Sequence, residues 1–249
     1  MSPRLQFALD VVYQAGRSTL GLFGTHHEVA LKSDQSPVTA ADTQAEAIIR
    51  KAIAENYPGE GILGEEEGES GPASTRWVLD PIDGTKSFIC GVPLYATLLS
   101  FELEGLPQLG VCYFPALDQM VWAESGEGTY CNGRACRVST TQNLSKSVLC
   151  CGSHFSMDKH GRALGFLELA KQAMTTRTWG DAYGHALVAM GRVEAMVDPV
   201  VQRWDVSAMQ IILSEAGGKM TGFDGSPNPS NQAVSSNGLL HAKLLEHFQ

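Results

Sequence analysis

The residues best suited to do chemistry lie in the segment Asp80-Pro81-Ile82-Asp83-Gly84. An apolar run precedes this segment, so a buried strand is expected to end directly on the carboxylate of Asp80. Asp80, Asp83 and the carbonyl oxygen of Ile82 are expected to face one place, and Gly84 lets the backbone approach a ligand closely. Oxygen ligands of this kind suit Mg²⁺ or Mn²⁺ rather than zinc.

The residues that follow, Gly84-Thr85-Lys86-Ser87, offer backbone N–H groups suited to phosphate oxygens, particularly if a helix begins there. A metal cage beside an anion cradle is what metal-assisted phosphoester hydrolysis requires. The alternative is an ordinary solvated turn, because Asp, Pro and Gly are common turn residues.

Three more carboxylates are candidate site residues that also have a purely structural interpretation. Glu65 follows the short apolar piece Ile62-Leu63-Gly64, which places it at the end of a buried strand, whereas the acidic residues after it are expected to form a solvated loop. Asp205 follows Trp204 and opens an expected helix, so it is an N-cap, a metal ligand or both. Asp42 is expected to be the capping-box acid of a helix that begins near Thr39.

The elements that must position these residues alternate along the chain. Apolar periodicity predicts helices at about 5–20, 39–57, 164–174, 182–190, 205–216 and 239–248. It predicts strands at about 61–64, 77–80, 94–103, 109–114, 120–123, 147–151 and 193–197. This alternation, without repeats, favours a layered α/β sandwich made of one domain over 1–249, with a soft internal boundary near 140–146.

Composition excludes several classes of partner. The 249 residues are 43% hydrophobic and 18% charged, and the formal net charge is −9, which argues against nucleic acid or an anionic membrane surface as the main partner. The six cysteines form no CxxC pair, so we interpret them as reduced thiols. The chain shows no signal peptide pattern and no apolar run long enough to span a bilayer, so a cytoplasmic location is expected.

Taken together, these segments closely resemble the inositol monophosphatase family, which includes phosphatases of inositol, histidinol, fructose-bisphosphate and nucleotide phosphates. The resemblance extends over nearly the whole chain. Its landmarks are Lys32-Ser33-Asp34, Val38-Thr39 with Asp42, Gly64-Glu65-Glu66, residues 77–85, Trp204-Asp205 and Glu215-Ala216-Gly217-Gly218.

The resemblance implies a layered αβαβα sandwich, a homodimer and a lithium-sensitive, Mg²⁺-dependent phosphomonoesterase. It implies that two or three Mg²⁺ ions per chain, with Mn²⁺ as a possible substitute, are held by Glu65, Asp80, the Ile82 carbonyl, Asp83 and Asp205. It also implies that Asp42 and Thr85, together with Glu65, are the catalytic residues, with Asp42 and Thr85 orienting and deprotonating the attacking water. Gly84 and Thr85 are expected to hold the phosphate through their backbone.

Within that family, three segments resemble the histidinol-phosphate phosphatase branch: Lys86-Ser87-Phe88, residues 91–95 and residues 177–185. The substrate is therefore expected to be a small phosphorylated metabolite, L-histidinol phosphate, whose hydrolysis to histidinol belongs to histidine biosynthesis. An inositol or broad-specificity sugar-phosphate phosphatase is the alternative. A metal-binding regulatory protein without activity is a remote one, since no expected ligand is missing.

A physical argument favours the histidinol branch. Asp181 and Asp198 add negative charge near the expected leaving group, and histidinol carries an ammonium, whereas inositol is neutral. A carboxylate that meets an ammonium in a partly dry pocket gains about 1.5–3 kcal/mol. Arg177 and Gly180 complete the expected substrate contacts. The alternatives are that Asp181 only caps a helix and that Asp198 only forms a turn.

Overall fold

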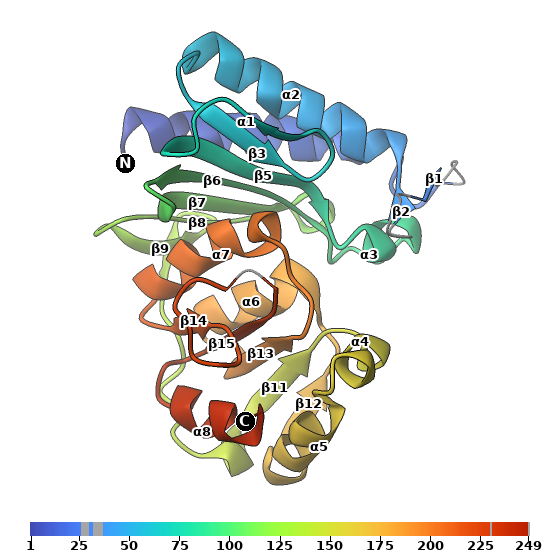
Figure 1. The fold of residues 1–249 in the computed structure, drawn as a ribbon, viewed down its shortest axis with the longest axis vertical. Helices are drawn as coiled ribbons and strands as arrows, with labels where there is room; N and C mark the ends of the chain where they lie inside the picture. The colour runs from blue at the N-terminus through green and yellow to red at the C-terminus, as the bar shows by residue number, and fades with distance from the viewer. Residues whose placement is uncertain (26–29, 32–36, 230, 249) are drawn as a thin grey trace.

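The computed structural model describes residues 1–25, 30–31, 37–229 and 231–248, so the landmark at 32–34 lies outside the described residues. Its helices and strands form stacked layers (Figure 1). The helices are α1 (Pro3–Thr19), α2 (Ala40–Asn56), α3 (Thr85–Ile89), α4 (His154–Lys159), α5 (Ala163–Gln172), α6 (Asp181–Ala189), α7 (Arg203–Glu215) and α8 (His241–Leu245), with 3₁₀ turns at Pro115–Leu117, Leu144–Lys146 and Glu246–Phe248.

The larger sheet has eight strands in the order β10-β9-β8-β7-β6-β5-β3-β4. Its strands are β3 (Gly61–Gly64), β4 (Gly68–Ser70), β5 (Thr75–Asp83), β6 (Ala96–Leu103), β7 (Leu106–Phe114), β8 (Gln119–Glu124), β9 (Gly128–Cys131) and β10 (Arg134–Cys136). Neighbours are antiparallel except β3 and β5, which run parallel. The carboxyl ends of β3 and β5 therefore lie at the same edge of the sheet.

The smaller sheet has five strands in the order β12-β11-β13-β15-β14. They are β11 (Val148–Cys151), β12 (Thr175–Arg177), β13 (Ala195–Asp198), β14 (Lys219–Thr221) and β15 (Ala233–Ser236), and a separate pair joins β1 (Ala30–Leu31) to β2 (Pro37–Val38). β11 runs parallel to both β12 and β13, whereas β15 is antiparallel to both of its neighbours.

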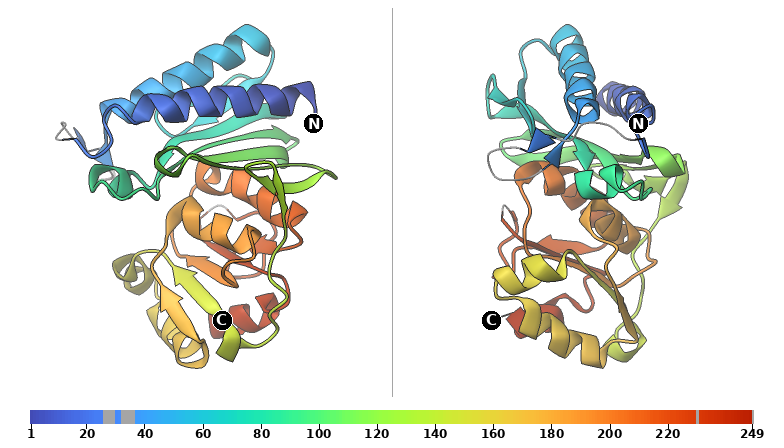
Figure 2. Two further views of the ribbon diagram at one scale, coloured as in Figure 1. Left: turned by 180° about the vertical axis from the view of Figure 1, so that it is seen from behind. Right: turned by 90° about the vertical axis from the view of Figure 1, so that its right-hand side faces the viewer.

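Alternation of side chains along the strands determines which layer each one contacts. Trp77 and Leu79 of β5 pack against α1 and α2, which cover one face of the larger sheet (Figure 2). Leu98 of β6 belongs to the core that α6 and α7 fill between the two sheets. In β13, Met196 faces that middle core, whereas Val197 faces the outer core beneath α4, α5 and α8. The layers therefore confirm the predicted αβαβα sandwich.

Most predicted elements are present, with shifted ends. The helix predicted at 205–216 begins earlier, at Arg203, and the one predicted at 239–248 is a short α-helix that continues as a 3₁₀ turn. Strands β1, β2, β4, β9, β10, β12, β14 and β15 were not predicted, because each is at most four residues long and lacks the run of apolar residues that indicated other strands of that length. All six cysteines are free thiols.

The chain passes from the larger to the smaller sheet through residues 137–147. We keep the interpretation of a single domain with an internal boundary near 140–146 as a proposal. In the part of the chain that the structure describes, every helix is too short or too polar to cross a bilayer.

Candidate active site

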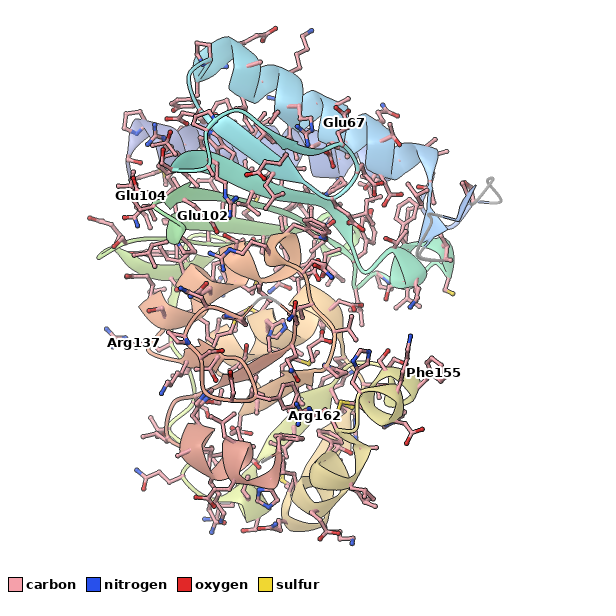
Figure 3. All side chains as sticks on the ribbon, viewed as in Figure 1. Glu67, Glu102, Glu104, Arg137, Phe155 and Arg162 are labelled. Atoms are coloured by element: carbon pink, nitrogen blue, oxygen red, sulfur yellow. The ribbon has the colours of Figure 1, made fainter. Side chains whose placement is uncertain are left out.

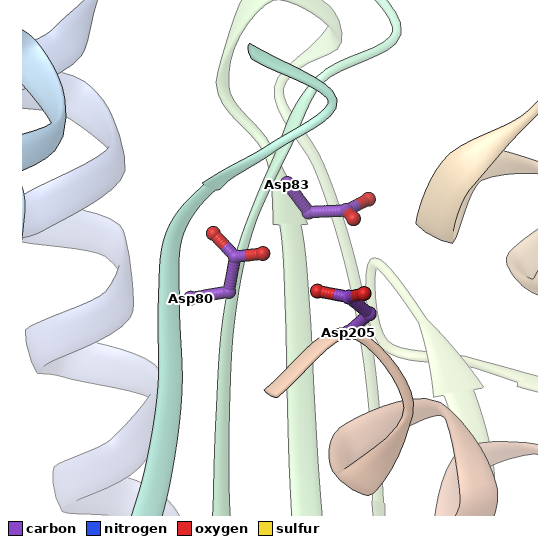
Figure 4. A group of neighbouring side chains, drawn as sticks. All are labelled: Asp80, Asp83 and Asp205. Atoms are coloured by element: carbon purple, nitrogen blue, oxygen red, sulfur yellow. The ribbon is translucent and has the colours of Figure 1, made fainter. Parts of the chain in front are cut away.

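Three aspartates gather at the edge of the larger sheet that faces the helices of the middle layer. Ligand oxygens of Asp80, Asp83 and Asp205 all lie within 4.8 Å of one another (Figure 4). The ladder between β5 and β6 is irregular between Asp80 and Asp83, where Pro81 has no N–H to donate. An irregularity of this kind redirects side chains, so two carboxylates three residues apart face the same place.

Asp205 reaches the cluster from the first turn of α7. The helix begins at Arg203 with Gln202 as its N-cap, and the N–H of Gln202 donates to Oδ2 of Asp205 at 2.7 Å. The expectation that Asp205 is the N-cap was therefore wrong, because it is the acid three residues further on in a capping box. The helix dipole places positive potential beside this carboxylate.

Glu65 stands at the turn after β3 and lines the same cavity as the three aspartates, a space of about 220 Å³. It hydrogen-bonds to Asp80, and its charge is among the causes that raise the pKa of Asp80. The parallel pairing of β3 with β5 explains this proximity, because Gly64 lies beside Leu79 in the register. The predicted ligand set of Glu65, Asp80, Ile82, Asp83 and Asp205 therefore surrounds one cavity.

The electrostatics of the cluster suit a cation. Burial raises the pKa of Asp80 and Asp83 well above the usual range, and the neighbouring carboxylates raise both further. Burial, with Glu65 nearby, raises the pKa of Asp205 to about 7. Among the described residues, no Lys or Arg forms an ion pair with any of the three aspartates. A hard cation such as Mg²⁺ fits this oxygen set and would offset the repulsion.

Asp42 is fully buried in the first turn of α2. Its Oδ2 accepts hydrogen bonds from the N–H and the hydroxyl of Thr39, at 2.8 and 2.6 Å, as the predicted capping box requires. Its Oδ1 has no hydrogen-bond partner. Burial raises the pKa of Asp42, and the charge of Glu65 raises it further. This oxygen is itself buried, and Asp42 does not line the cavity of the aspartate cluster.

Thr85 opens α3, and its hydroxyl donates to the carbonyl oxygen of Ile82 at 3.1 Å. Thr85 and Asp42 are therefore not hydrogen-bonded to each other in this structure. Thr85 lines the cavity of the aspartate cluster together with Ile82 and Gly84.

The backbone conformation and the close neighbours of residue 84 favour glycine at this position. Its φ is +81°, and a Cβ at this position would lie 3.1 Å from Oδ2 of Asp181. Asp181 itself has a φ of +56°, unusual for a non-glycine residue. It is the first residue of α6, with Gly180 as the N-cap, so it is not itself the N-cap. The next N–H, of Ala182, donates to Oδ2 of Asp83 at 2.6 Å and so ties α6 to the cluster.

A second cavity, of about 520 Å³, adjoins the first and shares Lys86 and Asp181 with it. Gly180, Asp181 and Asp198 line it, as predicted for the leaving-group side. Burial raises the pKa of Asp198 to about 8, with Asp181 contributing. Arg177 lines neither cavity, because its guanidinium donates to Thr175 and Thr176 and lies over the ring of Trp179.

Several residues of the second cavity escaped the sequence analysis. Gly152, Ser153 and His154 follow β11, and Asp198 ends β13, the strand parallel to it. The carboxyl ends of neighbouring parallel strands form binding crevices, so a correct pairing of β11 with β13 would have indicated these residues. Lys86 is the one Lys or Arg among the described residues that line either cavity.

Comparison with known proteins gives a consistent result. The model of the inositol monophosphatase family matches residues 1–249. A histidinol-phosphatase of Chlorobaculum parvum is 42% identical over 88% of this chain and 85% of that protein. An inositol-1-monophosphatase of Mesorhizobium japonicum is 33% identical over 98% of this chain and 96% of that protein. The structure of a Thermotoga maritima inositol monophosphatase is 31% identical, covers 99% of this chain and 96% of its own, and superposes with a TM-score of 0.91.

The layered αβαβα fold, with an acidic cluster at the edge of its larger sheet, is that of a phosphatase of the inositol monophosphatase type. The chain belongs to the inositol monophosphatase family, as its sequence predicted. It is a phosphomonoesterase, in agreement with the phosphatase names of its relatives.

Proposed function

We propose that the protein hydrolyses L-histidinol phosphate to L-histidinol and phosphate in a Mg²⁺-dependent reaction. The observation that supports this substrate is the pair of carboxylates, Asp181 and Asp198, in the cavity that adjoins the aspartate cluster. The similarity to a histidinol-phosphatase at 42% identity points the same way.

Glu65, Asp80, the Ile82 carbonyl, Asp83 and Asp205 would hold two or three Mg²⁺ ions, with Mn²⁺ as a possible substitute. Bound there, the metal neutralises phosphoryl charge and makes water a stronger acid. The repulsion among these buried carboxylates in the metal-free chain supports this assignment, because it disappears when a cation binds.

Asp42 is the proposed general base. Its Oδ2 is occupied by Thr39, which fixes the orientation of the carboxylate and leaves Oδ1 as the acceptor for a proton. Burial raises its pKa toward the working range of a base. Thr85 is held by the Ile82 carbonyl at the opening of α3, where its hydroxyl and the backbone of residues 84 and 85 would orient water and phosphate oxygens.

Asp181 and Asp198 are the proposed contacts for the leaving group. The substrate phosphate binds at the cluster, so its amino alcohol must extend into the adjoining cavity. Burial favours the neutral form of both carboxyls, and Asp181 adds to this effect on Asp198, whereas the ammonium of Lys86 opposes it for Asp181. A substrate ammonium would stabilise the charged form of both carboxylates, whereas a neutral polyol would not. Specificity for an aminated substrate follows from that difference.

A second candidate, hydrolysis of inositol 1-phosphate or other sugar phosphates, is supported by the relative named inositol-1-monophosphatase, at 33% identity. It would use the same cluster with a different leaving group. In either case we propose a homodimer, as the family resemblance implies.

The test is Mg²⁺-dependent phosphate release from L-histidinol phosphate and myo-inositol 1-phosphate, assayed in parallel at equal concentrations. We expect a clear preference for histidinol phosphate. Equal or faster turnover of inositol phosphate would refute the substrate assignment and leave the phosphatase chemistry in place. No turnover of either substrate with Mg²⁺ or Mn²⁺ would refute both candidates.

A further inference from the structure

Glu46 is a fully buried glutamate on α2 that lies outside the lining of both cavities. Its Oε2 accepts the N–H of Glu66 at 2.9 Å, and its Oε1 accepts the N–H of Glu67 at 3.0 Å. Both oxygens of the carboxylate are therefore used on the two peptide groups that directly follow Glu65. The Glu46 side chain therefore holds the backbone of the turn that carries this proposed metal ligand.

Arg50, one helical turn further along α2, completes the contact. Its Nε donates to Oε1 of Glu46 at 2.7 Å, and its Nη2 donates to the carbonyl oxygen of Gly68 at 2.6 Å. The pair therefore bridges α2 to both ends of the turn between β3 and β4. Figure 3 shows this turn, with Glu67 labelled, lying against α2.

The same helix presents Asp42 one turn before Glu46. Residues four apart lie on one face of a helix, so Asp42 and Glu46 both face the turn that follows β3. Because α2 is a rigid element of 17 residues, it sets the distance between the proposed base and the proposed metal ligand.

Burial of a carboxylate costs several kcal/mol unless hydrogen bonds and an opposite charge offset the loss of water. In this turn Glu65 and Glu66 are half-buried and Glu67 is exposed, so the turn lies at the surface of the protein. A fully buried carboxylate, paired with the partly exposed Arg50, therefore holds a surface turn. It removes the freedom of the turn to move.

We propose that Glu46 is a positioning residue that, with Arg50, holds Glu65 in register with Asp42 for metal binding. This inference rests on the proposed function, in which Glu65 is a metal ligand. Outer residues that orient metal ligands change metal affinity by about 10- to 100-fold when they are removed.

The experiment compares Glu46→Gln with the wild-type chain. A glutamine keeps the shape but offers one acceptor oxygen, and its NH₂ group would face an N–H donor. We expect the Mn²⁺ dissociation constant, measured by electron paramagnetic resonance of the free ion, to rise about tenfold. The Mg²⁺ concentration for half-maximal activity should rise in parallel. The matched control is Glu55→Gln, an exposed position on the same helix, which should leave both values unchanged.

A second variant tests the proposal if Glu46→Gln does not fold. A Cβ at Gly64 would overlap the Oε1 of Glu46 and lie 2.7 Å from Nη2 of Arg50, so Gly64→Ala displaces the pair without removing a charge. The displaced atoms are the ends of flexible side chains, and we expect weaker Mn²⁺ binding with a cooperative unfolding transition.

Wild-type Mn²⁺ affinity in Glu46→Gln or in folded Gly64→Ala would overturn the proposal, even if the melting temperature fell, because that outcome describes a purely structural role. Failure of the proposed function would be distinguishable, since the wild-type chain itself would then show no metal-dependent phosphatase activity.

Discussion

Carboxylate oxygens of Asp205, Asp80 and Asp83 lie within 4.8 Å of one another, and burial raises the pKa of Asp205 to about 7. A carboxyl whose pKa is raised on folding favours the folded state below its unfolded pKa of 3.8 and loses that advantage as pH rises through 7. At pH 8 the charged form therefore destabilises the fold. The variant Asp205→Asn removes this charge, so we expect it to be more stable than the wild-type chain without metal.

The pKa difference corresponds to about 4 kcal/mol at 1.36 kcal/mol per unit. Asp205 is only partly buried, so water screens part of this repulsion, and we expect about 2 kcal/mol. Asparagine retains a side-chain oxygen for the N–H of Gln202, so the capping interaction of α7 persists.

The assay is urea unfolding in EDTA at about pH 8 and about pH 5. The variant should exceed the wild type at the higher pH, and the difference should shrink at the lower pH, where the folded wild type is protonated. Excess Mg²⁺ should reverse the order, because it stabilises only the chain that binds it. Equal stabilities at pH 8, or a difference that does not change with pH, would refute the electrostatic reasoning.

Three further predictions concern single carboxylates. Asp83→Asn should lower Mg²⁺-dependent turnover at least about 100-fold, because even residues that only orient a metal ligand change activity or metal affinity about 10- to 100-fold. The circular dichroism spectrum should stay normal, and full turnover would rule out Asp83 as a ligand. Asp181→Asn should lower kcat/KM for histidinol phosphate about 10- to 100-fold and leave kcat/KM for inositol 1-phosphate unchanged. The control, Asp158→Asn at an exposed position, should change kcat/KM for neither substrate, and an equal loss on both substrates in Asp181→Asn would contradict amine recognition. Glu102→Gln should lower the free energy of unfolding by about 3 kcal/mol, because this buried carboxylate accepts hydrogen bonds from Arg76, Arg203 and Ser207. The control is Glu104→Gln, at a position labelled beside Glu102 in Figure 3, and equal stabilities of the two variants would contradict the prediction.

Local signals in the sequence predicted the geometry around Asp80, Asp83 and Asp42. Pro81 between two aspartates at the end of an apolar run predicted the turn that brings Asp80 and Asp83 together, and the ladder is irregular there. The spacing of Thr39 and Asp42 predicted a capping box that the structure contains. These features form within a few residues, so propensity and side-chain type decide them.

Tertiary structure alone decided how distant segments meet. Asp205 lies in the first turn of α7 rather than at its N-cap, and that turn is anchored by the bond from Arg203 to Glu102 of another layer. Arg177 was expected at the substrate and is held instead by Thr175 and Thr176.

Glu46 carries no signal in the sequence beyond its charge, yet its carboxylate accepts hydrogen bonds from the backbone of the turn after Glu65. The sequence placed Lys86 next to the expected phosphate cradle, but only the tertiary structure shows that it lines both cavities. The physical reason is that the burial of a side chain and its hydrogen-bond partners depend on which layers of the fold pack against each other. The local sequence therefore determined the ligand types and their turns, whereas the packing of two sheets around α6 and α7 determined which of them share a cavity.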